Sequence, residues 1–148
     1  MRDVRIKKYL KKMNYSYAFG FNPTVELLRT KPTKVTKVLF KNEANNYKET
    51  EQIRHICRQN KIRYEFNNRL IDKIAHKKNT YAVGIFQKYE DQLDRLNNHI
   101  VLVNPSDFGN LGTIIRGMSA FDFYDLALIK PAADIFNPKV ISTTTGAL

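Results

Sequence analysis

The sequence predicts an α/β fold in which a larger basic domain, residues 1–97, precedes a shorter unit, residues 98–148. Two observations predict this. Apolar and β-branched runs of strand length alternate with helical periodicity, which is typical of helices layered on a largely parallel or mixed sheet. The basic residues are also concentrated before position 99. With 43% hydrophobic and 26% charged residues among 148, the chain is expected to fold.

Periodicity and turn residues predict the elements of the first domain. A basic helix is expected at residues 2–12, within an N-terminal segment 1–14, either lying along phosphates or only solubilising the chain. Gly20 and Asn22-Pro23 mark the start of a helix that ends near Arg29. Further helices are expected at residues 47–59 and 69–76, and strands at residues 34–40, 62–66 and 81–86.

The second unit follows a polar stretch, residues 90–98, which is interpreted as a linker or a connecting helix. A buried-type strand is expected at 100–103, a helix at about 110–120 and another strand at 125–129. With the loop between the first strand and the helix, they form one βαβ unit whose ligand end is that loop. One such unit is too small to bury both faces of a parallel sheet, so the chain is expected to end inside a domain.

Charge separates the two parts. The formal net charge of the chain is +11. Residues 1–99 have a net charge of +12, from 22 basic and 10 acidic residues, and the remainder has −1, from 3 basic and 4 acidic residues. Counterion release from phosphates favours concentrating Lys and Arg in one part, so a polyanionic partner is expected. A merely solvated basic surface is the alternative.

Several other classes of function find little support in the sequence. No apolar run approaches the roughly 20 residues that span a bilayer, and the N-terminus lacks a secretory signal, so a cytoplasmic protein without membrane contact is expected. Cys57, the single cysteine, is interpreted as a buried or half-buried thiol. No metal is expected, because metal-ligand spacing is absent from His55, His76 and His99.

The most specific local pattern is Gly-Asn-Leu-Gly-Thr-Ile-Ile-Arg at residues 109–116. Its glycines are spaced GxxG, so it is neither a dinucleotide fingerprint nor a phosphate loop. Asn110 and Arg116 are about 240° apart if both are helical. They share a face only if Asn110 is still in the loop, as an N-cap would be. Spacing alone leaves Arg116 open between a catalytic role, an ion pair and a place at the rim.

Four stretches of the second unit together resemble a known family. They are Asn104-Pro105, residues 109–116, Ala120-Phe121 with residues 126–129, and residues 134–148. This pattern resembles the start of the SpoU class of RNA ribose 2′-O-methyltransferases, in the SPOUT superfamily. The resemblance implies that residues 98–148 are the first part of an α/β-knot domain. Residues 1–97 are similar, through residues 20–26 and 79–84, to the α/β/α ribosomal-protein-like substrate-binding domain that often precedes it.

The resemblance implies that Asn110 and Arg116 are catalytic residues of a methyltransferase that uses S-adenosylmethionine. The arginine would orient a phosphate and act with it in deprotonating the ribose 2′-hydroxyl, while Asn110 would shape the loop around it. The family's later cofactor motifs cannot be found in this chain. The residues that bind the cofactor therefore stay unknown, the chain alone is expected to be inactive, and a homodimer is expected for a full-length parent.

RNA, either rRNA or tRNA, is the partner that the resemblance implies. The candidate RNA-binding residues are Asn22, Arg29, Lys31, Lys34 and Lys37, with Arg54, Arg58, Lys77 and Lys78 as further candidates. Unpaired bases could stack on aromatic side chains that otherwise belong to the core, namely Tyr15, Tyr17, Phe19 and Phe21. The alternatives are a non-catalytic RNA-binding protein resembling a ribosomal protein, and a DNA-binding or general polyanion-binding protein.

Overall fold

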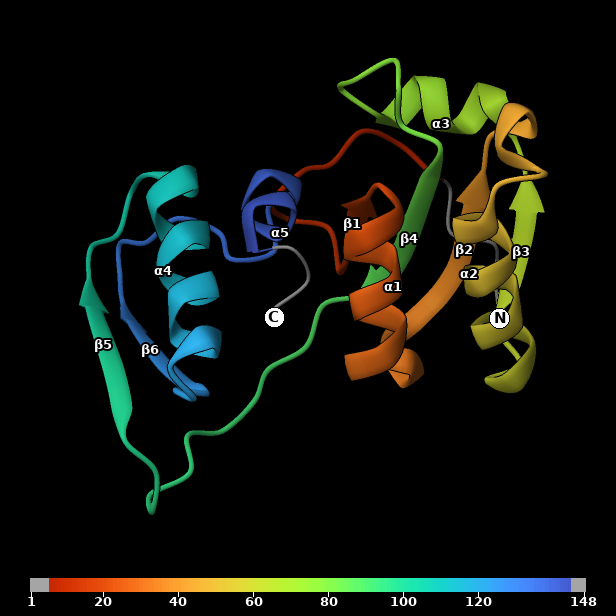
Figure 1. Ribbon diagram of the computed structural model, residues 1–148. Coiled ribbons are helices and arrows are strands. Elements are labelled where there is room, and N and C mark those ends of the chain that lie inside the picture. The colour runs from red at the N-terminus through yellow and green to blue at the C-terminus, as the bar shows by residue number, and fades with distance from the viewer. Residues whose placement is uncertain (1–5, 145–148) are drawn as a thin grey trace.

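The computed structural model describes residues 6–144, and Figure 1 shows them as two groups of helices and strands. The first group is built on one sheet in the order β1-β4-β2-β3, with the strands β1 (Tyr15–Phe19), β2 (Val35–Phe40), β3 (Arg63–Phe66) and β4 (Ala82–Gln87). Strand β4 is antiparallel to β1 and to β2, whereas β2 and β3 are parallel. The sheet is therefore mixed, and the predicted α/β class is confirmed.

Helices cover both faces of this sheet. Along β2 the side chains alternate, because successive residues of a strand point to opposite faces. Val38 and Phe40 pack in a core with α1 (Phe21–Thr30) and α2 (Lys48–Gln59). Leu39 packs in a second core with α3 (Asn68–Ile74). The arrangement is the predicted α/β/α layering.

The prediction of an N-terminal helix is wrong for the described residues. Residues 6–12 form no helix, and residues 1–5 lie outside the described part. The segment instead runs across the second core, where Met13 is buried and Tyr9 packs against it. Its backbone is held by the Tyr17 hydroxyl, which donates to the Lys7 carbonyl. Contacts with the sheet have overridden the helical propensity of this lysine-rich stretch.

Strand β1 was not predicted. Its five residues, Tyr15–Phe19, are read in the sequence only as the approach to the helix after Gly20. Four of the five are buried, and the aromatic residues at every second position, Tyr15, Tyr17 and Phe19, were the strand signal that the prediction overlooked. Residues 90–98 contain neither helix nor strand and are exposed, which makes them a linker and not a connecting helix.

The second group contains β5 (His99–Val103), α4 (Phe108–Ala120), β6 (Asp125–Ile129) and α5 (Pro138–Thr144). Strands β5 and β6 are parallel, and the predicted βαβ unit is confirmed. The expectation that residues 100–103 form a fully buried strand is wrong. The side chains of Val101 and Val103 are 54% and 72% exposed, because α4 covers only one face of this two-stranded sheet.

Helix α5 packs against both groups. Its Val140 lies in the core with Leu111 and Ile115 of α4, whereas Ile141 lies in the core beneath α1 and α2. A buried serine, Ser16, also donates to the Phe136 carbonyl at 2.5 Å. The division into domains at residues 97 and 98 stays a prediction. Within residues 6–144, no helix has the length and apolar character needed to cross a membrane.

Replacing Ile141 by alanine tests the packing of α5 on the first sheet. Ile141 is 3% exposed, so Ile141→Ala is expected to lower the free energy of unfolding by about 2–5 kcal/mol. Ile114, on α4, is 37% exposed, and Ile114→Ala is expected to cost less than about 1 kcal/mol. Urea unfolding followed by circular dichroism measures both. Equal losses for the two variants would contradict the packing described here.

Candidate functional site

The start of α4 lies at the carboxyl end of β5, where ligands bind in open α/β sheets. Asn104, directly after the strand, has a left-handed backbone with φ of 49°. Its N–H donates to the Ile129 carbonyl at 3.0 Å, and the Ala133 N–H donates to the Pro105 carbonyl at 2.6 Å. The loops that follow β5 and β6 are therefore held side by side at one edge.

Asp107 caps helix α4. Its carboxylate accepts a hydrogen bond from the Asn110 N–H at 2.6 Å, and a negative charge is favourable at a helix N-terminus. The condition that Asn110 lies in the loop as an N-cap is therefore not met, since Asn110 is the third residue of the helix. Sequence analysis missed Asp107 as the cap. The signal was present, because aspartate three residues before Asn110 is a preferred capping residue.

Asn110 and Arg116 do not share a face. Because both are helical, they are about 240° apart around α4 and separated by about 9 Å along it. Both are exposed. Within the described part of the chain, the Arg116 guanidinium forms no ion pair or hydrogen bond. The charge of Arg116 is thus available to an outside group, although the structure itself does not assemble a site from the two residues.

Close packing of α5 against α4 explains the second glycine of the motif, Gly112. A Cβ atom at this position would lie 2.6 Å from the Cβ of Thr143 and 3.1 Å from the carbonyl oxygen of Val140. Only glycine lets α5 approach α4 this closely. The GxxG pattern therefore serves helix packing at Gly112, and no phosphate-binding turn is needed to account for it.

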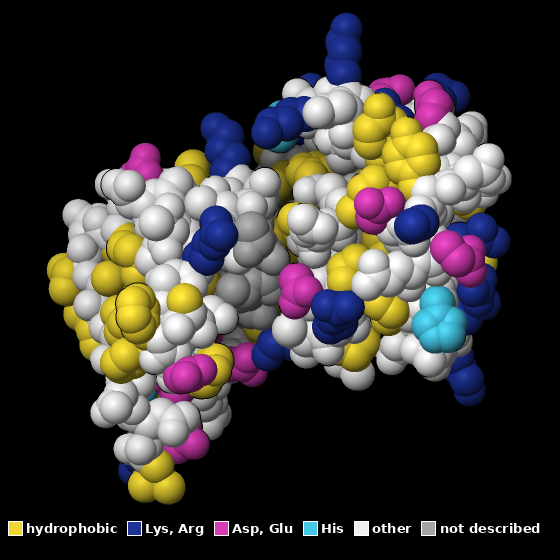
Figure 2. All heavy atoms as spheres, viewed as in Figure 1, with side chains coloured by type: hydrophobic (Ala, Val, Ile, Leu, Met, Phe, Trp, Pro, Cys, Tyr) yellow, Lys and Arg dark blue, Asp and Glu magenta, His cyan; other side chains and the backbone are white. Residues whose placement is uncertain are grey.

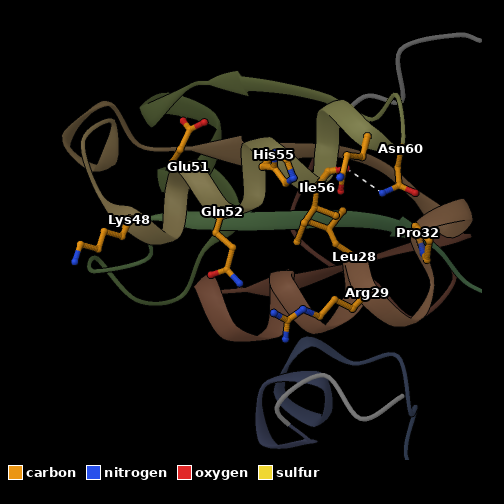
Figure 3. Close-up of a pocket in the computed structure, with 10 residues that line it drawn as sticks. Leu28, Arg29, Pro32, Lys48, Glu51, Gln52, His55, Ile56 and Asn60 are labelled. Atoms are coloured by element: carbon orange, nitrogen blue, oxygen red, sulfur yellow. Dashed lines mark hydrogen bonds between the residues drawn. The ribbon is translucent and has the colours of Figure 1, made fainter.

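Neither Asn110 nor Arg116 lines either of two hollows in the described structure. One of about 780 Å³ lies between α1 and α2 (Figure 3), with Leu28 and Ile56 among its residues and Arg29, Lys48 and His55 around them. The other, of about 820 Å³, lies between the linker at residues 89–93 and residues 118–136. Both join polar and apolar side chains.

The five candidate RNA-binding residues are not gathered into one patch. Asn22 is exposed at the start of α1, whereas Arg29 lies about 10 Å further along the same helix. Three of the cations already have carboxylate partners, at 2.9 to 3.2 Å: Arg29 with Glu26, Lys31 with Asp91 and Lys37 with Glu65. Lys34 has no ion-pair partner among residues 6–144.

The further RNA-binding candidates also divide into cations with a carboxylate partner and cations without one. Arg54 and Arg58 both pair with Glu51, at 3.3 and 2.6 Å. Lys77 and Lys78 are exposed and have no ion-pair partner in the part of the chain that the structure describes. Base stacking on Tyr15 and Tyr17 is ruled out, because these rings are 5% and 0% exposed in the core. Phe19 and Phe21 are half-buried.

The remaining titratable groups show no sign of a catalytic centre. Cys57 is buried, as predicted, and burial raises the pKa of its thiol to about 11. Tyr9 donates a hydrogen bond to Asp134, and burial, followed by that contact, raises the pKa of the phenol. Among residues 6–144, no three His, Cys, Asp or Glu side chains lie close enough to hold a metal ion.

Comparisons with known proteins extend this picture. Residues 97–148 match the model of the SpoU rRNA Methylase family. A 23S rRNA (uridine(2479)-2′-O)-methyltransferase from Streptomyces viridochromogenes is 31% identical over 72 residues, which are 45% of this chain and 25% of that protein. The predicted resemblance to the SpoU class is confirmed by these matches.

Solved structures show the same fold over most of the chain. An AdoMet-bound rRNA methyltransferase from Sinorhizobium meliloti has a TM-score of 0.71 at 22% identity, over 90% of this chain and 51% of that one. The AdoMet complex of the SpoU methyltransferase AviRb from Streptomyces viridochromogenes has a TM-score of 0.71 at 21% identity, over 91% and 52%. The chain spans about half the length of these structures, and a quarter of the relative matched by sequence.

Two glycines of α4 provide a matched test of the helix packing. Gly112→Ala is expected to lower the free energy of unfolding by about 1–3 kcal/mol, because α5 must move away from the added methyl group. Nothing lies within 4 Å of a Cβ at Gly117, so Gly117→Ala is expected to stabilise the chain by up to about 1 kcal/mol. Thermal unfolding by calorimetry compares them. A Gly112→Ala variant as stable as Gly117→Ala would refute the close contact.

Proposed function

We propose that this chain contributes RNA binding and part of the catalytic domain to an S-adenosylmethionine-dependent rRNA 2′-O-methyltransferase of the SpoU type. The observation that carries the proposal is the family match over residues 97–148, the part that contains Asn110 and Arg116. The fold shared with two AdoMet-bound structures over about 90% of the chain supports it. Because those structures are twice as long, the activity is proposed for the protein that carries this chain and not for the chain alone.

The charge distribution supports a division of labour between the two parts. Residues 1–99 hold a net charge of +12, and residues 100–148 a net charge of −1. A basic surface attracts the phosphates of RNA at long range and accounts for a large share of the affinity. The second part is nearly neutral, so it adds little to this attraction, and it contains the family motif. RNA is thus held mainly by the first part while its ribose is presented to the second.

Arg116 is proposed as the residue that acts on the substrate. A ribose 2′-hydroxyl must lose its proton as its oxygen attacks the methyl group that S-adenosylmethionine supplies. A guanidinium can hold the neighbouring phosphate in two-point contact and so place that phosphate beside the hydroxyl. Arg116 is exposed and has no carboxylate partner within residues 6–144, which suits such a contact. Asn110, near the capped start of α4, would shape the adjoining loop.

The residues of this chain would form only part of a binding site for the cofactor. The loop at Asn104-Pro105 and the segment around Ala133 are joined at the carboxyl edge of the two parallel strands. Irregular backbone at this edge is where α/β sheets hold nucleotide-like ligands, so it fits one wall of a site for S-adenosylmethionine. The remaining walls of the site are proposed to come from residues that correspond to the unmatched portion of these longer structures.

A second candidate, a non-catalytic RNA-binding protein, is favoured by one observation. Segment 134–144 is packed onto the first sheet through Ile141 and through the Ser16 hydrogen bond to Phe136. In that case the second part would serve only as a docked extension of the basic domain. Methyl transfer distinguishes the two candidates, because only the first requires a role for Arg116.

Replacing Arg116 tests the proposed activity. In the protein expressed from its own gene, Arg116→Gln is expected to slow methyl transfer from S-adenosylmethionine to rRNA by about 100-fold or more, as for loss of a group that assists proton transfer. Arg116→Lys keeps the charge but not the two-point contact, and is expected to recover little of the rate. Lys139→Gln, at another exposed cation, serves as the control. Methylation at the normal rate by Arg116→Gln would refute the proposed role.

RNA binding by the 148 residues is tested by titration over a salt series. The logarithm of the binding constant is expected to fall linearly with the logarithm of salt concentration, by about 0.7 per phosphate contacted on a single strand. Unlabelled RNA is expected to compete better than duplex DNA of the same length. Equal competition by both would support the general polyanion-binding alternative and contradict specific RNA binding.

A further inference from the structure

Three segments that are far apart in the sequence meet at one edge of the first sheet, at the top of the right-hand group in Figure 1. The Gly20 N–H donates to the Ala82 carbonyl at 2.8 Å, and the Lys41 N–H donates to the Tyr81 carbonyl at 2.9 Å. The starts of α1 and α2 and the loop between α3 and β4 therefore lie together. The aromatic and lysine residues discussed below are not among those that line the α1–α2 hollow, and the family motif lies in the second group.

Three aromatic rings form a continuous group at this edge. The rings of Phe21 and Tyr47 are 6.1 Å apart between centroids, and those of Tyr47 and Tyr81 are 5.7 Å apart. Tyr47 is 41% exposed, while Phe21 and Tyr81 are half-buried. A partly exposed ring fixed between two others presents a face without having to lose much side-chain freedom on binding. Figure 2 shows hydrophobic side chains gathered at the top of the right-hand group, with both basic and acidic side chains around them.

The loop that leads into Tyr81 is basic and anchored. Residues 75–81, between α3 and β4, contain two lysines and no acidic residue, which gives a net charge of +2. Lys77 and Lys78 are exposed at the tip. The loop is held from below by Lys41, which is 9% exposed, donates to the Lys78 carbonyl at 3.0 Å and pairs with Asp72 at 2.8 Å. The buried Lys41 thus fixes the backbone of the loop that carries the exposed Lys77 and Lys78.

We propose that this edge, the aromatic group of Phe21, Tyr47 and Tyr81 with the loop lysines Lys77 and Lys78, binds unpaired nucleotides of the RNA. The inference rests on the proposed RNA binding and states which surface and which RNA structure are involved. An unstacked base can lie on the exposed face of Tyr47, and the flanking phosphates can contact the two lysines. A duplex keeps its bases stacked inside and offers this surface phosphates alone.

Charge pairing explains why Lys77 and Lys78 are favoured over three of the five first-named RNA-binding candidates. Arg29, Lys31 and Lys37 each face a carboxylate at 3.2 Å or less, so their local charge is already balanced. Lys77 and Lys78 are not balanced in this way within residues 6–144. Phosphate binding at the paired sites would have to displace a carboxylate, whereas at the loop it displaces only counterions.

Fluorescence anisotropy with a labelled oligouridylate of about 12 nucleotides tests the proposal, because the affinity can be compared with that for an RNA duplex of equal length. Tyr47→Ala is expected to weaken single-strand binding by about 10-fold and to change duplex binding little. Tyr47→Phe keeps the ring and is expected to bind as the unaltered chain does. Tyr124→Ala removes a ring that is 72% exposed elsewhere and serves as the matched control.

The lysines are tested by the salt dependence. The double variant Lys77→Gln, Lys78→Gln is expected to lower the slope of log affinity against log salt by about 1.4, the value for two phosphates of a single strand. The double variant Lys130→Gln, Lys139→Gln removes the same charge at exposed positions of the second part and is expected to leave the slope unchanged. Circular dichroism verifies that each variant is folded.

The outcomes separate this inference from the proposed function. If the unaltered chain binds the single strand and Tyr47→Ala binds as tightly as Tyr124→Ala, the inference is overturned and RNA binding stands. Equal slopes for the two lysine double variants would also overturn it. If the unaltered chain binds neither single strand nor duplex, the proposed RNA binding itself fails, and this inference fails with it.

Discussion

Strand β4 is the element on which the rest of the first sheet depends, because it is the partner of both β1 and β2. Gly84 lies at its middle, and a Cβ there would be 3.1 Å from the Leu27 Cδ2 atom of α1. The missing side chain lets α1 lie close to the sheet. Since β4 is the last strand of the sheet in sequence, its pairing also draws the loop before it against the starts of α1 and α2. The proposed RNA surface is a direct product of that pairing.

Helices cover both faces of the first sheet, whereas the sheet of the second part is covered on one side only. Val101, Val103 and Ile129 are at least half exposed on β5 and β6. Apolar side chains on a parallel sheet are ordinarily buried on both faces. The chain matches about half the length of each of the two longer structures compared above. Helix α5 ties this part to the first sheet through Ile141, so the two parts do not depend on the linker alone.

In the proposed function, the two parts of the chain have different roles. The first holds the net positive charge and the aromatic edge, and the second holds the free Arg116 on a helix capped by Asp107. Long-range attraction of phosphates and local handling of a single ribose make different demands on a surface. The former needs many cations in a weakly specific array, whereas the latter needs one well-placed guanidinium. Separating them allows each surface to meet one demand.

The order of helices and strands between residues 21 and 129, the βαβ unit, the charge asymmetry and the SpoU resemblance could all be predicted from the sequence. These are local properties, because periodicity, turn residues and motif spacing are carried by neighbours along the chain. Three outcomes required the three-dimensional structure: residues 6–12 are not helical, Tyr15 and Tyr17 are core, and Asn110 and Arg116 lie on different faces. The three-dimensional structure also decided which lysines are balanced by carboxylates and which are free. Each of these outcomes depends on residues distant in sequence or on where a helix begins, which local patterns of residue type do not encode.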